Sequence, residues 1–349
     1  MIRVLRCVVI LLMFSATAKA DNLPAAEGSA SAAVPAPTTA PVVSAPATTE
    51  VAKTPPAEAT TPPKPPSIVF KTQADGTGSF HFPLTGSKKS LEVFTYQPAG
   101  SDATTPVIMV MTGVDRNAST YRNDWIKVAD QYHFRIIVPR FDEQDFPGSY
   151  GYNLGNIQDA KTHRRLPKSQ WSFALVNDIF DALRQQGVTS QPQYYLFGNS
   201  AGCQFVHRML TLLPQPEVKA AICAAAGWWT LPDTDQRWPY GLRESPVKVT
   251  QSQLGDYFSK PILFTVGAND DDPENRLLRH SKQAMAQGAN RLERAENYFT
   301  ISQQQAELNN LPFNWHFVVL PDIGHSGSKM SVYAAGQFSH FEQQHEFNP

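Results

Sequence analysis

The sequence predicts an α/β fold in which helices cover both faces of a mostly parallel β-sheet. Three observations support this prediction. Short apolar runs, such as residues 107–111 and 262–266, are typical of buried parallel strands. Segments with apolar residues at helical spacing, such as 121–132, separate these runs. Finally, a G-x-S-x-G pentapeptide at 198–202 lies between a strand pattern and a helix pattern.

The predicted elements follow one another regularly along the chain. In order, the expected strands are residues 80–83, 91–96, 107–111, 136–138, 194–197, 220–226, 262–266 and 315–320. The first two resemble a hairpin, and the others are joined through helices, which implies right-handed crossovers. The expected helices are 121–132, 171–183, 206–213 and one that begins near Lys329. Gly187 suits the position just after the second helix, because glycine tolerates a left-handed backbone.

Two stretches, 142–168 and 228–257, do not fit this alternation. Both leave the carboxyl ends of strands, where loops build functional sites in such sheets. The second stretch, an insertion after the strand that follows the serine helix, begins with Trp228 and Trp229. One interpretation is a cap that forms a substrate pocket over the serine, and the other is simple packing of aromatic residues onto the body.

Residues 1–20 have the pattern of a secretory signal peptide. Arg3 and Arg6 precede an apolar run at 7–14, and Ala18-Lys19-Ala20 is a small-x-small cleavage site. We therefore expect export to the periplasm or secretion. The alternative is an uncleaved membrane anchor, although the run is short for a bilayer span.

Residues 21–66 are expected to form a disordered linker. They contain 11 of the 28 prolines, with alanine, threonine, serine and valine making up most of the rest. Such a composition cannot bury enough apolar surface to offset the entropy of ordering. The linker is either a spacer for a domain associated with the cell envelope or a tail without a specific role. Residues 67–349 then form one catalytic domain.

The domain at 67–349 is nearly neutral, with 25 Lys and Arg against 27 Asp and Glu. This balance excludes an electrostatic nucleic-acid binder, while the oligomeric state stays open. Cys203 and Cys223 lie on the helix after the serine and on the next strand. A disulfide between them is conceivable, but we expect two buried free thiols, because spacing alone cannot establish the geometry of a bridge.

Ser200 requires a base and an acid if it is to act as a nucleophile. Strand order favours His325, which stands just after the last predicted strand. The acid is expected after strand 262–266, where three aspartates are consecutive. We select Asp270, with Asp272 as the alternative acid or a helix cap, and we expect Asp271 to be solvated.

An oxyanion hole needs two backbone N–H groups that face the reacting carbonyl oxygen. The expected donors are Ala201, directly after the serine, and Val114, in the loop after strand 107–111. Arg116 in the same loop is a pocket candidate, although we favour a role in holding its own loop. No metal or organic cofactor is expected, because the sequence has no HExxH, CxxC or phosphate-binding glycine loop.

Six segments carry a resemblance to a known family over about residues 91–338. They read TGVDRNASTYRNDW, FPGSYGYNLGN, FGNSAGCQFVHR, AGWWTLPD, VGANDDDP and PDIGHS. In these segments the chain resembles α/β-hydrolases of the serine esterase type, and it is most similar to secreted bacterial hydrolases related to polyhydroxybutyrate depolymerases and feruloyl esterases. Asn199 and Thr112 stand where relatives often have histidine. The resemblance implies an acyl-enzyme on Ser200 and a small or polymeric ester substrate.

Two other functions stay open at this stage. The same three residues can run an amidase, peptidase or deacetylase, because esters and amides share the nucleophile. A non-catalytic binding protein on the same fold is the second alternative. It would be expected to lose one of the three residues, and the sequence retains all of them.

Overall fold

The computed structural model describes residues 67–349, so the expected signal (1–20) and linker (21–66) lie outside the described residues. The strands are β1 Thr77–Pro83, β2 Ser90–Tyr96, β3 Val107–Met111, β4 Arg135–Arg140, β5 Tyr194–Asn199, β6 Val218–Ala224, β7 Ile262–Gly267 and β8 Trp315–Leu320. The helices are α1 Ala118–Tyr132, α2 Gly148–Gly151, α3 Ser172–Gln185, α4 Ala201–Leu212, α5 Gln251–Ser259, α6 Lys282–Met285, α7 Arg291–Leu308 and α8 Gly327–Gln344, with a short 3₁₀ helix at Lys168–Gln170.

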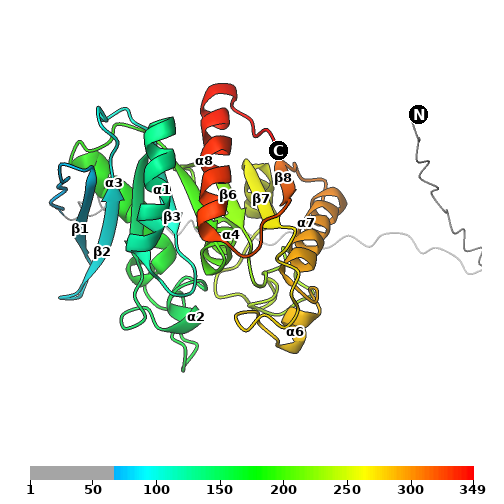
Figure 1. Cartoon of the computed structure of the whole chain (residues 1–349). Helices are drawn as coiled ribbons and strands as arrows, with labels where there is room; N and C mark the ends of the chain where they lie inside the picture. The colour runs from blue at the N-terminus through cyan, green and yellow to red at the C-terminus, as the bar shows by residue number, and fades with distance from the viewer. Residues whose placement is uncertain (1–66) are drawn as a thin grey trace, which may run out of the picture. The chain divides into compact units, whose positions relative to one another are not determined.

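The strands form one eight-stranded sheet in the order β1-β2-β4-β3-β5-β6-β7-β8 (Figure 1). The hairpin β1–β2 is antiparallel and joins the sheet antiparallel to β4. From β4 to β8 every neighbouring pair is parallel. The predicted α/β fold is therefore confirmed, and all the expected strands are present with ends shifted by a few residues.

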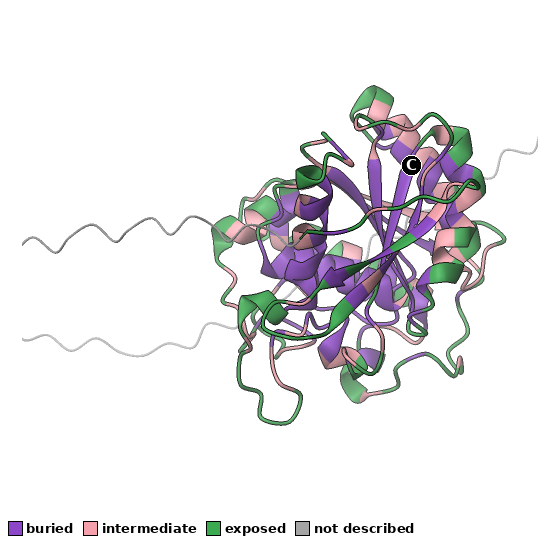
Figure 2. Cartoon of the chain, turned by 90° about the vertical axis from the view of Figure 1, so that its left-hand side faces the viewer, coloured by how far each residue is buried: buried purple, intermediate pink, exposed green. Residues whose placement is uncertain are grey.

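Helices cover both faces of the sheet. On one face α1 and α8 lie side by side, and their apolar residues, such as Trp125 and Phe338, share a core with the sheet. On the other face α3, α4, α5 and α7 form a second core, which includes Phe205 and Tyr298. Figure 2 shows the strands as a buried layer between helices whose outer surfaces are exposed. Within residues 67–349, none of the helices combines the length and apolar character needed to cross a membrane.

The structure departs from the sequence prediction after β6. Part of the expected loop is helical, because α5 begins at Gln251 behind a capping box formed by Thr250 and Gln253. The long helix α7 was not predicted, since its sequence RLERAENYFTISQQQAEL is polar over most of its surface. Tyr298 and Ala295 of α7 are nevertheless buried against the sheet. Packing against the sheet thus stabilises α7, although its weak apolar periodicity does not predict a helix.

The expectation of two free thiols is wrong, because Cys203 and Cys223 form a disulfide. Cys203 is in the first turn of α4 and Cys223 is on β6, the strand beside β5. The turn from β5 into α4 brings their Cα atoms to 4.6 Å. This approach depends on how the helix crosses the sheet, which sequence spacing does not show.

Candidate active site

Ser200 is the single residue between the end of β5 and the start of α4, where the chain turns sharply. Its backbone has φ 58° and ψ −116°, a left-handed conformation that is rare for a residue other than glycine. Two glycines make this turn sterically allowed. A Cβ atom at Gly202 would lie 2.1 Å from the carbonyl oxygen of Met111, and one at Gly198 would lie 2.3 Å from the carbonyl oxygen of Gly202. Only glycine fits at both positions, so the helix can start against β3 with the half-buried Ser200 at the strand end.

Three of the predicted site residues meet at the carboxyl edge of the sheet. The Oγ of Ser200 lies 3.0 Å from Nε2 of His325, and the Nδ1 of His325 lies 2.7 Å from Oδ2 of Asp270. These residues come from the ends of β5, β7 and β8, three strands that are close together in the sheet although 55 and 125 residues separate the bonded pairs. The geometry permits proton transfer from the hydroxyl to the imidazole.

The two candidate acids, Asp270 and Asp272, differ in burial and in hydrogen-bond partners. Asp270 is buried, and its other oxygen, Oδ1, accepts a hydrogen bond of 3.1 Å from the buried guanidinium of Arg291. Asp272 is exposed and caps the local turn by accepting a hydrogen bond from the N–H of Glu274. Asp271 is exposed as well, as expected. Arg291, the first residue of α7, is a site residue that sequence reasoning missed, since nothing in the sequence distinguishes it from other arginines.

The two expected oxyanion donors lie beside the serine. Ala201 is the first residue of α4, and N–H groups in a first turn have no acceptor within their own helix. The N–H of Val114 donates no backbone hydrogen bond within residues 67–349. Both residues line the cavity that contains Ser200. The N–H of Ala201 thus lies at the positive end of the α4 dipole, and Val114 adds a second backbone donor at the same cavity.

Two tyrosines hold the loops around the serine. The hydroxyl of Tyr152 donates a 2.8 Å hydrogen bond to the carbonyl of Thr112, directly before the loop with Val114. The hydroxyl of Tyr121 accepts a 3.0 Å hydrogen bond from Nδ2 of Asn199, the residue before the serine. Burial raises the pKa of both tyrosines, so their hydroxyls stay protonated at neutral pH. Side chains from other elements therefore hold the carbonyl of Thr112 and the side chain of Asn199, on the two segments that flank the serine.

The cavity at Ser200 has a volume of about 290 Å³. Trp228 lines it, whereas Trp229 lies outside its lining and stacks on Tyr298, with ring centroids 4.2 Å apart. Arg116 also lines the cavity, but its guanidinium donates to three backbone carbonyls, those of Phe141, Phe146 and Gly148. Arg116 therefore holds the loop 141–148, which fits the structural role favoured from the sequence.

Hydrogen-bond donors without acceptors gather in one part of this cavity. The side-chain oxygen of Gln204 is occupied by Nδ2 of Asn153 at 2.6 Å, which leaves its Nε2 group as a free donor. The Nε of Arg291 is buried and has no acceptor within residues 67–349. Both nitrogens face Gly227, where a Cβ atom would lie 3.2 Å from the first and 4.0 Å from the second. Arg279 stacks on Trp228 at 4.6 Å at the same cavity and pairs with no carboxylate of the described residues.

Comparison with known proteins supports this assignment of the fold. Neither a protein-family model nor the sequence of a curated protein matches the chain. Among solved structures, the chain is similar to poly(aspartic acid) hydrolase-1 from Sphingomonas sp. KT-1, with 36% identity, a TM-score of 0.71 and coverage of 75% of this chain and 97% of that one. It is also similar to LpqC, the poly(3-hydroxybutyrate) depolymerase from Bordetella parapertussis, with 32% identity, a TM-score of 0.70 and coverage of 78% and 92%.

A more distant structure shares the fold alone. The S-formylglutathione hydrolase from Agrobacterium tumefaciens is 13% identical, with a TM-score of 0.52 and coverage of 80% of this chain and 99% of that one. The two nearer structures exceed 30% identity over nearly their whole length. Together with the parallel sheet and the serine turn, they show that this chain is a member of the α/β-hydrolase family, of the esterase and depolymerase type.

Proposed function

We propose that this hydrolase cleaves carboxylic esters through an acyl-enzyme on Ser200. The observation that carries the proposal is the continuous hydrogen-bond chain from the Ser200 hydroxyl through His325 to the buried carboxylate of Asp270. A serine hydroxyl is a poor nucleophile until a neighbouring base removes its proton. In this arrangement Asp270 holds the imidazole tautomer whose Nε2 is free to accept that proton.

The proposed reaction has two halves. In the first, Ser200 Oγ attacks the ester carbonyl while His325 takes the hydroxyl proton, and the negative oxygen is stabilised by the N–H groups of Ala201 and Val114. The tetrahedral intermediate collapses, His325 returns the proton to the leaving alcohol, and the acyl group stays on the serine. In the second half, His325 deprotonates water, which attacks the acyl carbonyl. As the resulting tetrahedral intermediate collapses, His325 returns the proton to Ser200 Oγ, which releases the carboxylic acid and restores the serine.

A fluorophosphonate probe tests this proposal directly, because it labels only an activated serine. We expect stoichiometric labelling of the folded protein and none of Ser200→Ala. Ser149→Ala, at a second serine of the same cavity, is the matched control and should label like the unmodified protein. Absence of labelling in folded protein would refute the mechanism and favour the non-catalytic binding alternative.

One observation favours a second candidate function, the hydrolysis of substrates that carry a carboxylate. Gln204 and Arg291 each have an N–H group without an acceptor at the cavity of Ser200, and the charge of Arg279 there is paired with no carboxylate of the described residues. The similar poly(aspartic acid) hydrolase-1 is named for an acidic polyamide, and LpqC is named for a neutral polyester. The donors match the acidic substrate, whereas a neutral polyester leaves the charge of Arg279 without a partner.

A substrate panel distinguishes the two candidates. Aryl esters of butyrate and of succinate (as the half-ester), whose acyl chains both have four carbons, should be compared, beside peptides, acetylated sugars and acyl chains of graded length. The second candidate predicts that the succinyl ester is preferred, by about tenfold in kcat/KM, and that Arg279→Gln removes the preference without affecting the butyrate ester. Equal rates on both esters would contradict it and leave the simple esterase. Cleavage of amides alone would instead identify an amidase.

A further inference from the structure

The segment after β6 separates two cavities. Gly227 and Trp228 line the cavity of Ser200, whereas Trp229 lines a second one of about 630 Å³ between this segment, α6 and α7. We call the second one the Trp229 cavity. Its volume lies within the range of small-molecule sites, which is about 300–1,000 Å³. The reaction proposed above makes no use of it.

Aromatic and aliphatic side chains form much of the wall of the Trp229 cavity. The rings of Trp229 and Tyr298 lie nearly parallel, with 11° between their planes. Tyr240, Leu231 and Ile301 add further apolar surface. Such a wall favours a ligand with an apolar or aromatic body, because contact with it removes apolar surface from water.

A buried positive charge stands in the same wall. Arg294 is 0% exposed, and it forms no ion pair with any carboxylate of residues 67–349. Its Nε and one terminal nitrogen donate to the carbonyls of Gly288 (2.9 Å) and Gly227 (2.6 Å), and the other terminal nitrogen reaches only the sulfur of Met285, a weak acceptor. Burial lowers the pKa of Arg294 to about 10, so the guanidinium is still charged at neutral pH. Buried charges in proteins are normally paired, and this one lacks its counter-ion.

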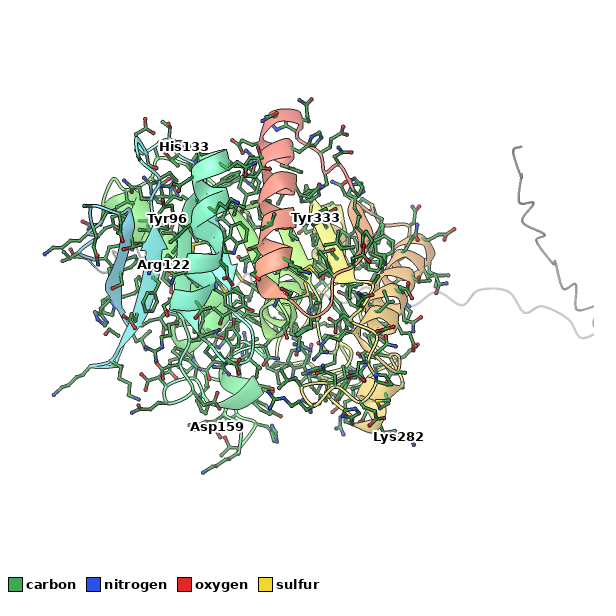
Figure 3. All side chains as sticks on the ribbon, in the orientation of Figure 1. Tyr96, Arg122, His133, Asp159, Lys282 and Tyr333 are labelled. Carbon is green, nitrogen blue, oxygen red and sulfur yellow. A yellow bond between two sulfur atoms is a disulfide. The ribbon has the colours of Figure 1, made fainter. Side chains whose placement is uncertain are left out.

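Two further donors of the Trp229 cavity lack acceptors. The Nε1–H of Trp229 is buried and makes no hydrogen bond with the described part of the chain. Lys282 on α6 lines the cavity from the exposed side and forms no ion pair within residues 67–349 (Figure 3). None of the residues that line the cavity is an aspartate or a glutamate. The lining of the Trp229 cavity thus includes the cations Arg294 and Lys282 and no acidic residue.

We propose that the Trp229 cavity is a binding site for an organic carboxylate with an apolar or aromatic body. The carboxylate neutralises the charges of Arg294 and Lys282, while the body packs on the aromatic wall. Carboxylic acids of this class are what an ester hydrolase releases, so the site is suited to a reaction product. Binding itself does not depend on the chemistry of Ser200.

Isothermal titration calorimetry on the full-length protein tests the site. 4-Phenylbutyrate is the probe, and its neutral amide is the control ligand. We expect one carboxylate to bind per chain, and the amide to bind at least about tenfold more weakly, because it lacks the charge-assisted hydrogen bonds to Arg294. Equal binding of the amide, or no binding of the carboxylate at millimolar concentration, would overturn the proposal.

A matched pair of variants locates the binding. Arg294 also holds two backbone carbonyls, so its replacement endangers the fold, and a variant that obstructs the cavity is preferable. Gln283→Trp places an indole at the lining of the Trp229 cavity, and Gln304→Trp makes the same change on the exposed surface of α7. We expect Gln283→Trp to weaken probe binding about tenfold or more and Gln304→Trp to leave it unchanged. Binding that survives Gln283→Trp would place the probe elsewhere, for example at Ser200, and refute the assignment. Because hydrolysis is not measured, failure here leaves the proposed esterase untouched.

Discussion

Asp270 accepts hydrogen bonds from two side chains of the candidate site at once. His325 binds one carboxylate oxygen and Arg291 binds the other. Both partners are polar groups in a largely buried environment, so the carboxylate is held in one orientation. Asp272, two residues away, has neither partner and lies in solvent. The difference between the two aspartates is therefore a matter of position rather than of chemical type.

The pair Asp270→Asn and Asp272→Asn tests this difference. We expect Asp270→Asn to lower kcat by about 10³- to 10⁴-fold, because an asparagine amide favours the wrong imidazole tautomer. The same substitution in the Ser-His-Asp triad of a serine protease has an effect of this size. Asp272→Asn should stay within about twofold of the unmodified protein, since it removes only an exposed turn hydrogen bond. Steady-state kinetics with one aryl ester measures both. A large loss in Asp272→Asn together with an active Asp270→Asn would reverse the assignment.

At the level of single elements, helix α3 carries an aspartate, Asp178, whose burial disfavours the charged form of its carboxyl group. Asp178 is half-buried on this helix, and burial, reinforced by Asp181, raises the pKa of its carboxyl to about 6. A raised pKa means that the folded protein holds the proton more tightly than the unfolded chain does. The resulting penalty is absent well below pH 4, where both states are protonated, grows as the pH rises from about 4 to about 6, and is constant at higher pH, where both states are ionised.

Asp178→Asn removes the charge and should therefore stabilise the protein at neutral pH. We expect the free energy of unfolding to rise by about 1–3 kcal/mol at pH 7 and to change little at pH 4. Urea unfolding at the two pH values measures the effect, and the acidic sample serves as the internal control. An equal gain at both pH values would show that the charge is not the cause.

The helix α5 depends on a local signal, the capping box at its start. The Oγ1 of Thr250 accepts from the N–H of Gln253 at 3.2 Å, and Oε1 of Gln253 accepts from the N–H of Thr250 at 2.9 Å. We expect Thr250→Ala to cost about 1 kcal/mol of stability, because a first-turn N–H loses its acceptor. Ser252→Ala, on the exposed surface of the same helix, is the control and should be neutral or slightly stabilising. Chemical denaturation compares the two, and similar costs for both variants would speak against the cap.

At the scale of the whole molecule, the catalytic domain is expected to be exported behind the signal at residues 1–20. We expect cleavage after Ala20, so that the mature protein begins at Asp21. Intact mass and N-terminal sequencing of protein expressed from the full chain in a bacterial host measure this, with a chain starting at Asp21 as the control that stays in the cytoplasm. A protein that retains its first 20 residues in the membrane fraction would support the anchor alternative instead.

Several features of the site are readable in the sequence because they depend on the order of elements. Parallel strands with helical crossovers place all their carboxyl ends at one edge of the sheet, so the loops after β5, β7 and β8 lie at the same edge. The G-x-S-x-G pentapeptide indicates Ser200, and the order of the strands indicates His325 and Asp270. The glycines at 198 and 202 likewise mark the tight turn, because no other residue fits there.

The sequence alone thus determined the parallel sheet, the serine turn and the three side chains that meet there, since all of these follow from local patterns and strand order. Only the tertiary structure decided the contacts that cross between elements without local signals. In the structure Arg291 pairs with Asp270 and Cys203 is bonded to Cys223. Trp229 lines the second cavity rather than the serine pocket that the sequence suggested. The physical reason is that such contacts depend on how α4 and α7 pack against the sheet, and packing is set by the whole core rather than by any short stretch of chain.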